Sequence, residues 1–545
     1  MTLRQRPGGD SRSISERVRA ACVTILAVVL LSSALTLAQR GALGAVSFDN
    51  SGSPAAQESF LAGLAQLHNF EYAAAADLFR RAQQIDPGFA MAYWGEAMTY
   101  NHPVWMEQDR GAARKVLARL GATREARVAR AKTKREQDYI RAVETLYGDS
   151  DKQACDLAYA DAMADIYRAY PDDPDAAAFY ALALLGTAHA GRDFAIYMRA
   201  ASIVEPVFRD HPNHPGAAHY LIHSYDDPIH APLGLRAARV YSRIAPSAGH
   251  AQHMTSHIFL ALGLWDDVVE ANEAAVKVVD AGRARRQMSA SACGHYNFWL
   301  EYGYLQQRRF SAAKQLLANC HAVAKRATRE ASAGDGRQML DPDSSPAGSF
   351  AGMRLRYILD TEDWTADVVS WTVDAGSQQR TRIALEFGSG YAAARAGRKA
   401  DAAGALERLR RAREALGAAA GAANTASDAE VAREWARILE IQLTALTSGI
   451  AGSIAALQDV AIAEEKLPIE FGPPAIDKPS YELLGEALLA ADRPKEAQAA
   501  FEKALARTPD RTASLVGLMQ AAEKLGDVRK ATAIRAKLQT IWKRG

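Results

Sequence analysis

The sequence has few cysteines and almost no net charge. Its four cysteines, at positions 22, 155, 293 and 320, form no C-x-x-C pair, so neither a thiolate zinc site nor a thioredoxin-like motif is supported. Cys293 and Cys320 are close enough in sequence to pair across a helical hairpin, but we expect buried free thiols. The formal net charge of +2 gives no reason to expect a nucleic acid as partner.

Proline and runs of β-branched residues are also scarce, whereas alanine is frequent along the whole chain. Alanine is the best helix former, and β-branched residues lose side-chain freedom in helices. The composition therefore predicts an all-α protein, and 545 residues suffice for one large repeat array or several domains. No G-x-S-x-G, P-loop, G-x-G-x-x-G or H-E-x-x-H motif stands at a credible position, which leaves open whether the protein is an enzyme.

Long apolar runs are missing except for one near the N-terminus, from Ala20 to Ala38. Five arginines precede this run, and Thr36 and Ala38 are the small residues that a signal peptidase reads. The pattern predicts a secretory signal at residues 1–38, cleaved after Ala38. The alternative is an uncleaved anchor, because 19 apolar residues are just enough to span a bilayer. In both cases we expect an exported protein, periplasmic or secreted, that meets a membrane only through this segment if it is uncleaved.

Two stretches near the ends of the remaining chain repeat one spacing of small, aromatic and proline residues. In both, successive positions are separated by 12, 4, 3 and 5 residues. The two sets are Gly63, Ala75, Phe79, Ala82 and Pro87, and Gly485, Ala497, Phe501, Ala504 and Pro509. Small residues let two helices approach, phenylalanine fills the gap to the next unit, and proline ends the helix. We therefore predict antiparallel helix hairpins joined by short turns.

This spacing resembles the tetratricopeptide repeat (TPR), a helix hairpin of 34 residues. The resemblance implies an α-α superhelix, a TPR-like solenoid, which usually binds a protein or peptide in its concave groove. We expect an N-terminal array over residues 55–333, middle helical pairs over 347–416 and a C-terminal array over 427–545. The loop-like stretch Gly334–Gly348 and the Ala/Gly-rich stretch Gly417–Asp428 separate them. The proline-dense segment Leu467–Pro479 is expected to brace the array, with Phe471 folded back onto it.

Histidine is scarce outside one window, because nine of the thirteen histidines lie between His189 and His257. The window holds two H-x-x-x-H pairs, His219 with His223 and His253 with His257, and residues four apart share one helix face. A lone histidine is more often a core or surface residue than a ligand, but two such pairs indicate a shared site. The stretches HYLIHSYDDP and HMTSHIF look like those of a subgroup of exported bacterial TPR-containing proteins, a resemblance that transfers no catalytic residue.

Prolines and glycines that mark helix ends place the histidine pairs on alternate helices. The expected first helices of three hairpins are Asp175–Ala190, Pro215–Tyr225 and Ser247–Leu262, and first helices line the concave surface of a TPR array. The helices expected between them, Phe194–Arg209 and Pro232–Ile244, carry no histidine. We therefore predict a metal site made from residues on the first helices. Neutral imidazoles suit zinc, copper or nickel better than calcium or magnesium, and we expect zinc or copper. The predicted ligands are His219, His223, His253, His257 and His189.

Several neighbouring residues are given supporting roles. Asp226 and Asp227 follow the first pair and are expected to orient ring nitrogens. His214, His230 and His250 flank helix ends or turns, and we expect them to cap helices or to be solvated. His295, which opens the next first helix, is a weaker candidate for the same surface.

Two functions fit these patterns. The first is an exported TPR scaffold that binds a protein or peptide in its groove, with a histidine cluster that binds a transition metal. The alternative is a metal-dependent enzyme in which the ion keeps an open position and an acid or base comes from Asp226, Asp227, Glu96 or Tyr220. Without a metal, the histidines would line a polar groove for a peptide or small ligand. Mutual repulsion of protonated imidazoles would also permit pH sensing.

Overall fold

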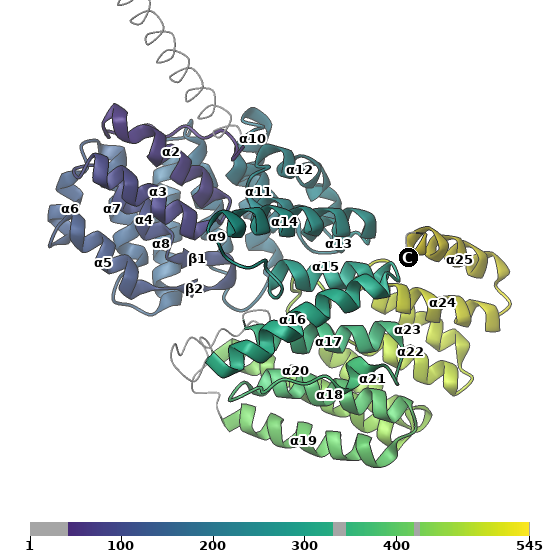
Figure 1. The fold of residues 1–545 in the computed structure, drawn as a ribbon. Helices are drawn as coiled ribbons and strands as arrows, with labels where there is room; N and C mark the ends of the chain where they lie inside the picture. Colours follow the sequence, from purple (N-terminus) through teal and green to yellow (C-terminus); the bar gives the residue numbers. More distant parts are fainter. Residues whose placement is uncertain (1–41, 331–344, 419–425, 544–545) are drawn as a thin grey trace, which may run out of the picture.

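The computed structural model describes residues 42–330, 345–418 and 426–543. The predicted signal sequence and most of the two predicted linkers lie outside these residues. The described part forms twenty-four α-helices, three short 3-10 helices and one two-stranded antiparallel sheet, so the fold is an all-α, TPR-like solenoid of helix hairpins, as the sequence predicts (Figure 1). Among these helices, none combines the length and the apolar character needed to cross a membrane.

The elements follow one another with short connections. The elements up to α13 are α2 (Pro54–His68), α3 (Tyr72–Ile85), α4 (Ala90–Met98), β1 (Asn101–His102), η1 (Pro103–Trp105), β2 (Glu107–Gln108), α5 (Arg110–Leu120), α6 (Arg124–Arg130), α7 (Lys134–Leu146), α8 (Lys152–Ala169), α9 (Pro174–Leu185), α10 (Phe194–Asp210), α11 (Pro215–Tyr225), α12 (Ala231–Ile244) and α13 (Gly249–Ala261). They continue with α14 (Trp265–Arg285), α15 (His295–Gln306), α16 (Phe310–Glu330), α17 (Pro346–Thr361), η4 (Asp367–Ser370), α18 (Gln379–Arg395), α19 (Lys399–Ala418), α20 (Ala426–Ser448), η6 (Ile450–Ser453), α21 (Ile454–Glu465), α22 (Ser480–Ala490), α23 (Pro494–Arg507), α24 (Thr512–Lys524) and α25 (Val528–Trp542).

The repeated spacing has the packing role that the sequence predicts. Phe79 of α3 is fully buried, and a Cβ added at Gly63 of α2 would lie only 3.0 Å from its ring. The same ring would lie 2.4 Å from a Cβ added at Gly95 of the next hairpin. Each phenylalanine of this spacing thus fills the gap between two first helices, and glycine is needed where those helices meet its ring.

The cysteines depart from the prediction. Cys293 and Cys320 form a disulfide, so the expectation of free thiols was wrong for this pair, whereas Cys155 is a buried free thiol as expected. The bond forms because α15 begins two residues after Cys293 and packs against α16, which carries Cys320. Sequence spacing alone permits this approach but does not require it.

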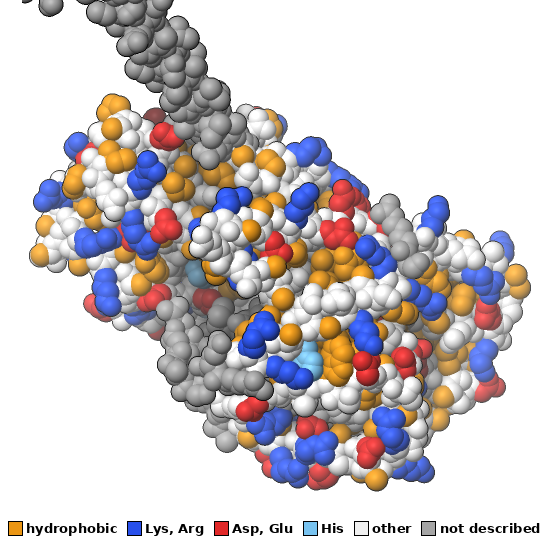
Figure 2. Space-filling model, in the orientation of Figure 1, with side chains coloured by type: hydrophobic (Ala, Val, Ile, Leu, Met, Phe, Trp, Pro, Cys, Tyr) orange, Lys and Arg blue, Asp and Glu red, His pale blue; other side chains and the backbone are white. Residues whose placement is uncertain are grey.

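The C-terminal helices pack against helices from the middle of the chain. The indole Nε1 of Trp265 in α14 donates to the carbonyl of Asp510 at 2.9 Å, and the backbone N–H of Thr512 donates to Gln306 Oε1 at 2.9 Å. Figure 1 shows the yellow helices α24 and α25 on the side of the molecule that carries α13 and α15. On the face drawn in Figure 2, basic and acidic side chains are interspersed, without a large area of one sign.

The segment Leu467–Pro479 braces the array, as predicted. A Cβ added at Gly191 would lie 2.6 Å from Pro468, and one added at Gly472 would lie 2.5 Å from the Trp299 ring. Gly472 also has a φ of +105°, a conformation that disfavours residues with a side chain. These close contacts fix the segment beside the helices that carry the histidines.

Candidate metal centre

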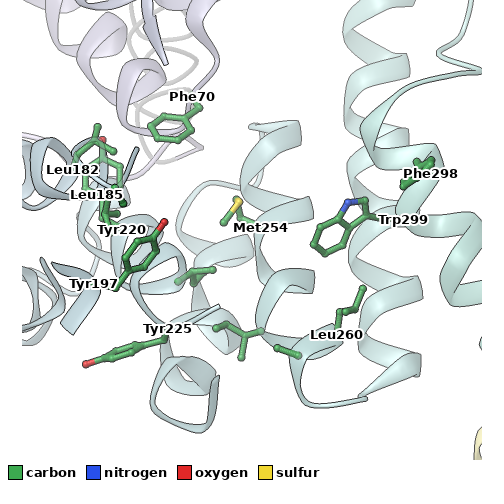
Figure 3. Packing of buried hydrophobic residues seen from close by; sticks show 14 of the residues in the cluster. Phe70, Leu182, Leu185, Tyr197, Tyr220, Tyr225, Met254, Leu260, Phe298 and Trp299 are labelled. Carbon is green, nitrogen blue, oxygen red and sulfur yellow. The ribbon is translucent and has the colours of Figure 1, made fainter. Parts of the chain in front are cut away.

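Three first helices, α11, α13 and α15, carry the histidine cluster. His219 and His223 lie on α11, His250, His253 and His257 on α13, and His295 is the first residue of α15. The rings are enclosed: His219 and His253 are 0% exposed and His257 is 2% exposed. The buried rings do not line a groove open to a peptide, and a small ligand at these histidines stays a prediction. Figure 3 shows the side chain of Trp299 directed from α15 toward α13, where its ring packs against His253.

The rings form two groups of three rather than one group of four. In each group the three nitrogen atoms that could bind an ion lie within 4.8 Å of one another. The groups are His219, His223 and His250, and His253, His257 and His295. Each H-x-x-x-H pair is thus completed by a third histidine from the next first helix. A mixed group, His223 and His257 with the carboxylate of Asp226, takes one ring from each of these groups. The sequence predicts a capping or solvated role for His250 and only a place on the same surface for His295, because helix periodicity does not show which rings of one hairpin contact those of the next.

The rings of His253 and His257 are both held through Nδ1. His257 Nδ1 lies 2.9 Å from Asp226 Oδ2, and His253 Nδ1 lies 2.7 Å from Asn272 Oδ1. The amide nitrogen of Asn272 donates to the carbonyl of Val268 at 2.8 Å, so its oxygen faces the histidine. Because carboxylate and amide oxygens accept hydrogen bonds, we assign the proton of both neutral rings to Nδ1.

This assignment leaves two lone pairs facing each other. The Nε2 atoms of His253 and His257 lie 3.1 Å apart. With both protons on Nδ1, neither Nε2 can donate to the other, so the contact is repulsive unless a cation or an added proton lies between them. Burial holds the pKa of His253 well below its usual value and lowers that of His257 to about 4. Neutral rings that share a metal ion therefore fit this arrangement better than an imidazolium.

The first group has a similar but less constrained arrangement. His219 Nδ1 donates to the carbonyl of His68 at 2.6 Å, which leaves the lone pair of this neutral ring on Nε2. His250 Nε2 lies 3.2 Å from that atom, a separation that suits either an N–H···N hydrogen bond or two ligands of one ion. Burial, the largest cause, holds the pKa of both rings well below the usual value.

Asp226 and Asp227 have different neighbours. Besides His257, Asp226 lies near the ring of His223, with 3.4 Å between its Oδ2 and Nδ1, and it pairs with the buried Arg192. Although burial opposes ionisation, Arg192 and the two histidines lower the pKa of Asp226. Asp227 instead accepts from the backbone N–H of Ile229 at 2.9 Å and lies 2.9 Å from His230 Nδ1. Of the two predicted orienting acids, only Asp226 contacts rings of the two groups.

Aromatic side chains surround the imidazoles. The ring of Phe70 lies 4.3 Å from that of His219, between centroids, and Trp299 stacks on His257 at 4.5 Å. Phe471 of the bracing segment also stacks on His257, at 4.9 Å between centroids. The predicted fold-back of Phe471 is confirmed, and it adds an apolar wall to the cluster.

His189 does not join the cluster. The expected helix Asp175–Ala190 ends at Leu185, so His189 lies in the following loop instead of on a helix face. Its Nε2 lies 2.8 Å from Asp156 Oδ2, and within the described residues it belongs to none of the groups that could hold an ion. The prediction that His189 lies on a first helix, as the other candidates do, was wrong, because α9 ends at Leu185, just before Gly186.

A further His–Asp–His group is a hydrogen-bonded network. His214 Nδ1 accepts from the backbone N–H of Ala217 at the start of α11, so its proton is on Nε2 and points toward Asp175 at 3.4 Å. His68 Nε2 lies 2.7 Å from the same carboxylate, and its Nδ1 lies 2.9 Å from the hydroxyl of Tyr220. The three ligand atoms also lie within 4.8 Å of one another, but both imidazoles already have a role here, His68 as a hydrogen-bond partner of Asp175 and His214 as the N-cap of α11. The capping role predicted for His214 is confirmed. The hydroxyl of Tyr220 contacts His68, and its ring lies 5.4 Å from that of His219, between centroids.

The fold and the cluster together define a helical-repeat protein with buried imidazoles. No family model matches the chain, and no curated protein matches it. Among solved structures the chain is similar to yeast Tom70, with 9% identity, 89% of this chain and 92% of that chain covered, and a TM-score of 0.31. It is also similar to the APC/C hetero-tetramer Cut9–Hcn1, with 13% identity, 91% of this chain and 81% of that chain covered, and a TM-score of 0.29. The P58(IPK) TPR domain is similar as well, with 13% identity, 87% of this chain and 99% of that chain covered, and a TM-score of 0.20. At TM-scores below 0.5, these similarities assign no ligand or partner to the chain.

Proposed function

We propose that this chain is an exported helical-repeat protein that binds a transition-metal ion, zinc or copper, through buried imidazoles. The observation that carries the proposal is that the Nε2 atoms of His253 and His257 lie 3.1 Å apart. The Nδ1 atom of each ring is already hydrogen-bonded to an acceptor. A tetrahedral ion with bonds of about 2.0–2.1 Å spaces its nitrogen ligands about 3.3–3.4 Å apart, so a small shift of the rings admits it. Acceptors on Nδ1 are the usual outer partners of histidine ligands.

The proposal is tested by metal retention. The purified protein is stripped with a chelator, reloaded separately with zinc and with copper, dialysed, and analysed by mass spectrometry for metal per chain. We expect the wild type to retain metal and His253→Ala/His257→Ala to retain at least one ion fewer. His211→Ala, which removes an exposed imidazole, is the control and should match the wild type. Equal retention by the double variant and the wild type, or none by either, would overturn the proposal.

Export is the second part of the proposal. The apolar run at Ala20–Ala38 supports it, and so does the Cys293–Cys320 disulfide, because disulfides persist mainly in oxidising compartments outside the cytosol. N-terminal sequencing of protein recovered from the periplasm or medium should begin at Gln39. An intact N-terminus in the membrane fraction would instead support the anchor, and recovery from the cytoplasm alone would contradict export.

A protein or peptide partner belongs to the proposal as well, but not at the histidines. Since those rings are buried, a partner would bind other surfaces of the hairpin array. Metal binding and partner binding are then separable. A crosslinked partner of the wild type should still be captured by His253→Ala/His257→Ala, and its loss together with the metal would contradict this separation.

A metal-dependent enzyme is a second candidate. It is favoured by the grouping in threes, because three protein ligands leave a tetrahedral ion one position for water or substrate. Cobalt-substituted protein provides a test, since its visible spectrum reports the ligands directly. A spectral change on adding azide would show an exchangeable position. An unchanged spectrum would favour a closed site that stores the metal or stabilises the fold.

A further inference from the structure

The two histidine groups are built by the same rule. In each, an H-x-x-x-H pair on one first helix is joined by a histidine at the start of the next first helix. His250 is the second residue of α13 and completes the α11 pair, and His295 is the first residue of α15 and completes the α13 pair. The pairs are 34 residues apart, so the second pair repeats the first, one hairpin further along, and in each group the third histidine is one of the first two residues of the next first helix.

One ion cannot bind all six imidazoles. Bonds of about 2.0–2.1 Å keep all ligand atoms of an ion within about 4.2 Å of each other. Among the described residues, the groups whose atoms lie within 4.8 Å of one another contain at most three of these imidazoles, and the one group that takes a ring from each side, His223 with His257, has the Asp226 carboxylate as its third member. The groups nevertheless adjoin. Ring centroids lie 5.6 Å apart between His223 and His257, and 6.1 Å apart between His250 and His253. Within the groups, the corresponding distances are 4.5–5.0 Å.

Asp226 links the two groups. Its Oδ2 lies 2.9 Å from Nδ1 of His257, in the second group, and 3.4 Å from Nδ1 of His223, in the first. Both contacts are made at Nδ1, which leaves Nε2 of each ring for an ion. Asp226 is therefore a positioning residue for one ligand of each group.

We propose that the six histidines form a two-ion centre, with one transition-metal ion in each group of three and Asp226 between them. This inference rests on the proposed metal binding and specifies how many ions bind and where. Within the described residues the preceding hairpin lacks such a site, because the position 34 residues before His219 is Leu185 and the position 34 before His223 is His189, which is outside a helix. The centre therefore consists of one group between α11 and α13 and one group between α13 and α15.

The closing experiment counts ions in group-specific variants. We expect two copper or zinc ions per chain in the wild type, one in His219→Ala/His250→Ala, one in His253→Ala/His295→Ala, and none in the four-fold variant. Circular dichroism checks that each variant is folded. Two ions in the wild type with half lost in each double variant supports the centre. One ion in the wild type overturns the two-ion centre but leaves the proposed function standing, whereas no ion in the wild type overturns both.

A measurement on the wild type alone covers variants that fail to fold. Copper(II) is added in steps to the stripped protein and followed by electron paramagnetic resonance. We expect the signal to rise to one equivalent and then to broaden or decline toward two, because adjacent copper ions interact magnetically. A signal that keeps rising in proportion to bound copper, without broadening, shows isolated ions and overturns the two-ion centre.

Discussion

At the scale of single residues, Asp226 and Asp227 are neighbours in sequence with separate tasks. Both are fully buried beside Arg192, yet only Asp226 holds a ring of each histidine group, whereas Asp227 holds the turn before α12. The sequence indicates an orienting acid at this position but not which of the two it is. That choice depends on the direction in which the chain leaves α11.

This difference gives a prediction for matched variants. Asp226→Asn keeps the size of the side chain but weakens its hold on His223 and His257, and loss of such an outer partner typically costs about 10–100-fold in metal affinity. Asp227→Asn should leave the affinity close to that of the wild type. Competition with a chelator of known affinity measures both. Equal losses in the two variants would show a general effect of the buried charge on this turn.

Among the histidines, the sequence predicts the pairs but not the third member of each group. The four-residue spacing identifies His219, His223, His253 and His257 because it is a property of one helix. His250 and His295 meet these pairs only through the packing of neighbouring hairpins, and the same packing brings the backbone carbonyl of His68 to His219.

At the scale of helices, the repeated glycine–phenylalanine spacing decides how closely hairpins stack. Phe501 lies 2.6 Å from the Cβ position of Gly485 and 2.2 Å from that of Gly517, repeating the arrangement of Phe79 at the other end of the chain. The sequence predicts the contact inside each hairpin. The second contact, to the next hairpin, is the one that stacks the array.

Alanine substitutions should therefore have opposite effects at two helical glycines. Gly517→Ala places a methyl group inside the contact distance of a buried ring, and overpacking of this kind costs about 1–3 kcal/mol. At Gly404 of α19 the nearest atom is the flexible end of Arg408, 3.4 Å away, so Gly404→Ala should stabilise by about 0.4–1 kcal/mol. Urea unfolding measures both changes. Unchanged stability of Gly517→Ala would show that the hairpins separate easily.

At the scale of the whole molecule, one buried arginine joins hairpins that are distant in sequence. Arg511, just before α24, lies 2.7 Å from Asp360 of α17 and 2.9 Å from Glu482 of α22, and it also donates to the hydroxyl of Tyr302 in α15. It is 1% exposed. The C-terminal hairpins are thus tied to the middle of the chain, although the sequence suggests separate arrays.

Arg511→Met should weaken this tie. Removing one partner from a buried ionic network leaves uncompensated carboxylates and costs about 3–5 kcal/mol. We expect a lower calorimetric transition temperature and an earlier separate transition of the C-terminal helices. Arg493→Met, which removes an exposed arginine paired with Glu496, is the control and should unfold like the wild type. An unchanged transition in Arg511→Met would show that the C-terminal hairpins depend little on the rest.

The sequence by itself determined the helical class, the hairpin repeat and the four paired histidines, because each is set by periodicity along a single helix or between adjacent ones. Tertiary structure alone decided that the histidines are buried in two groups, that Asp226 lies between them, that Cys293 meets Cys320, and that Phe471 closes over His257. The disulfide links the chain just before α15 to α16 within one hairpin. The other contacts join residues from different hairpins, and their distances depend on how the hairpins stack.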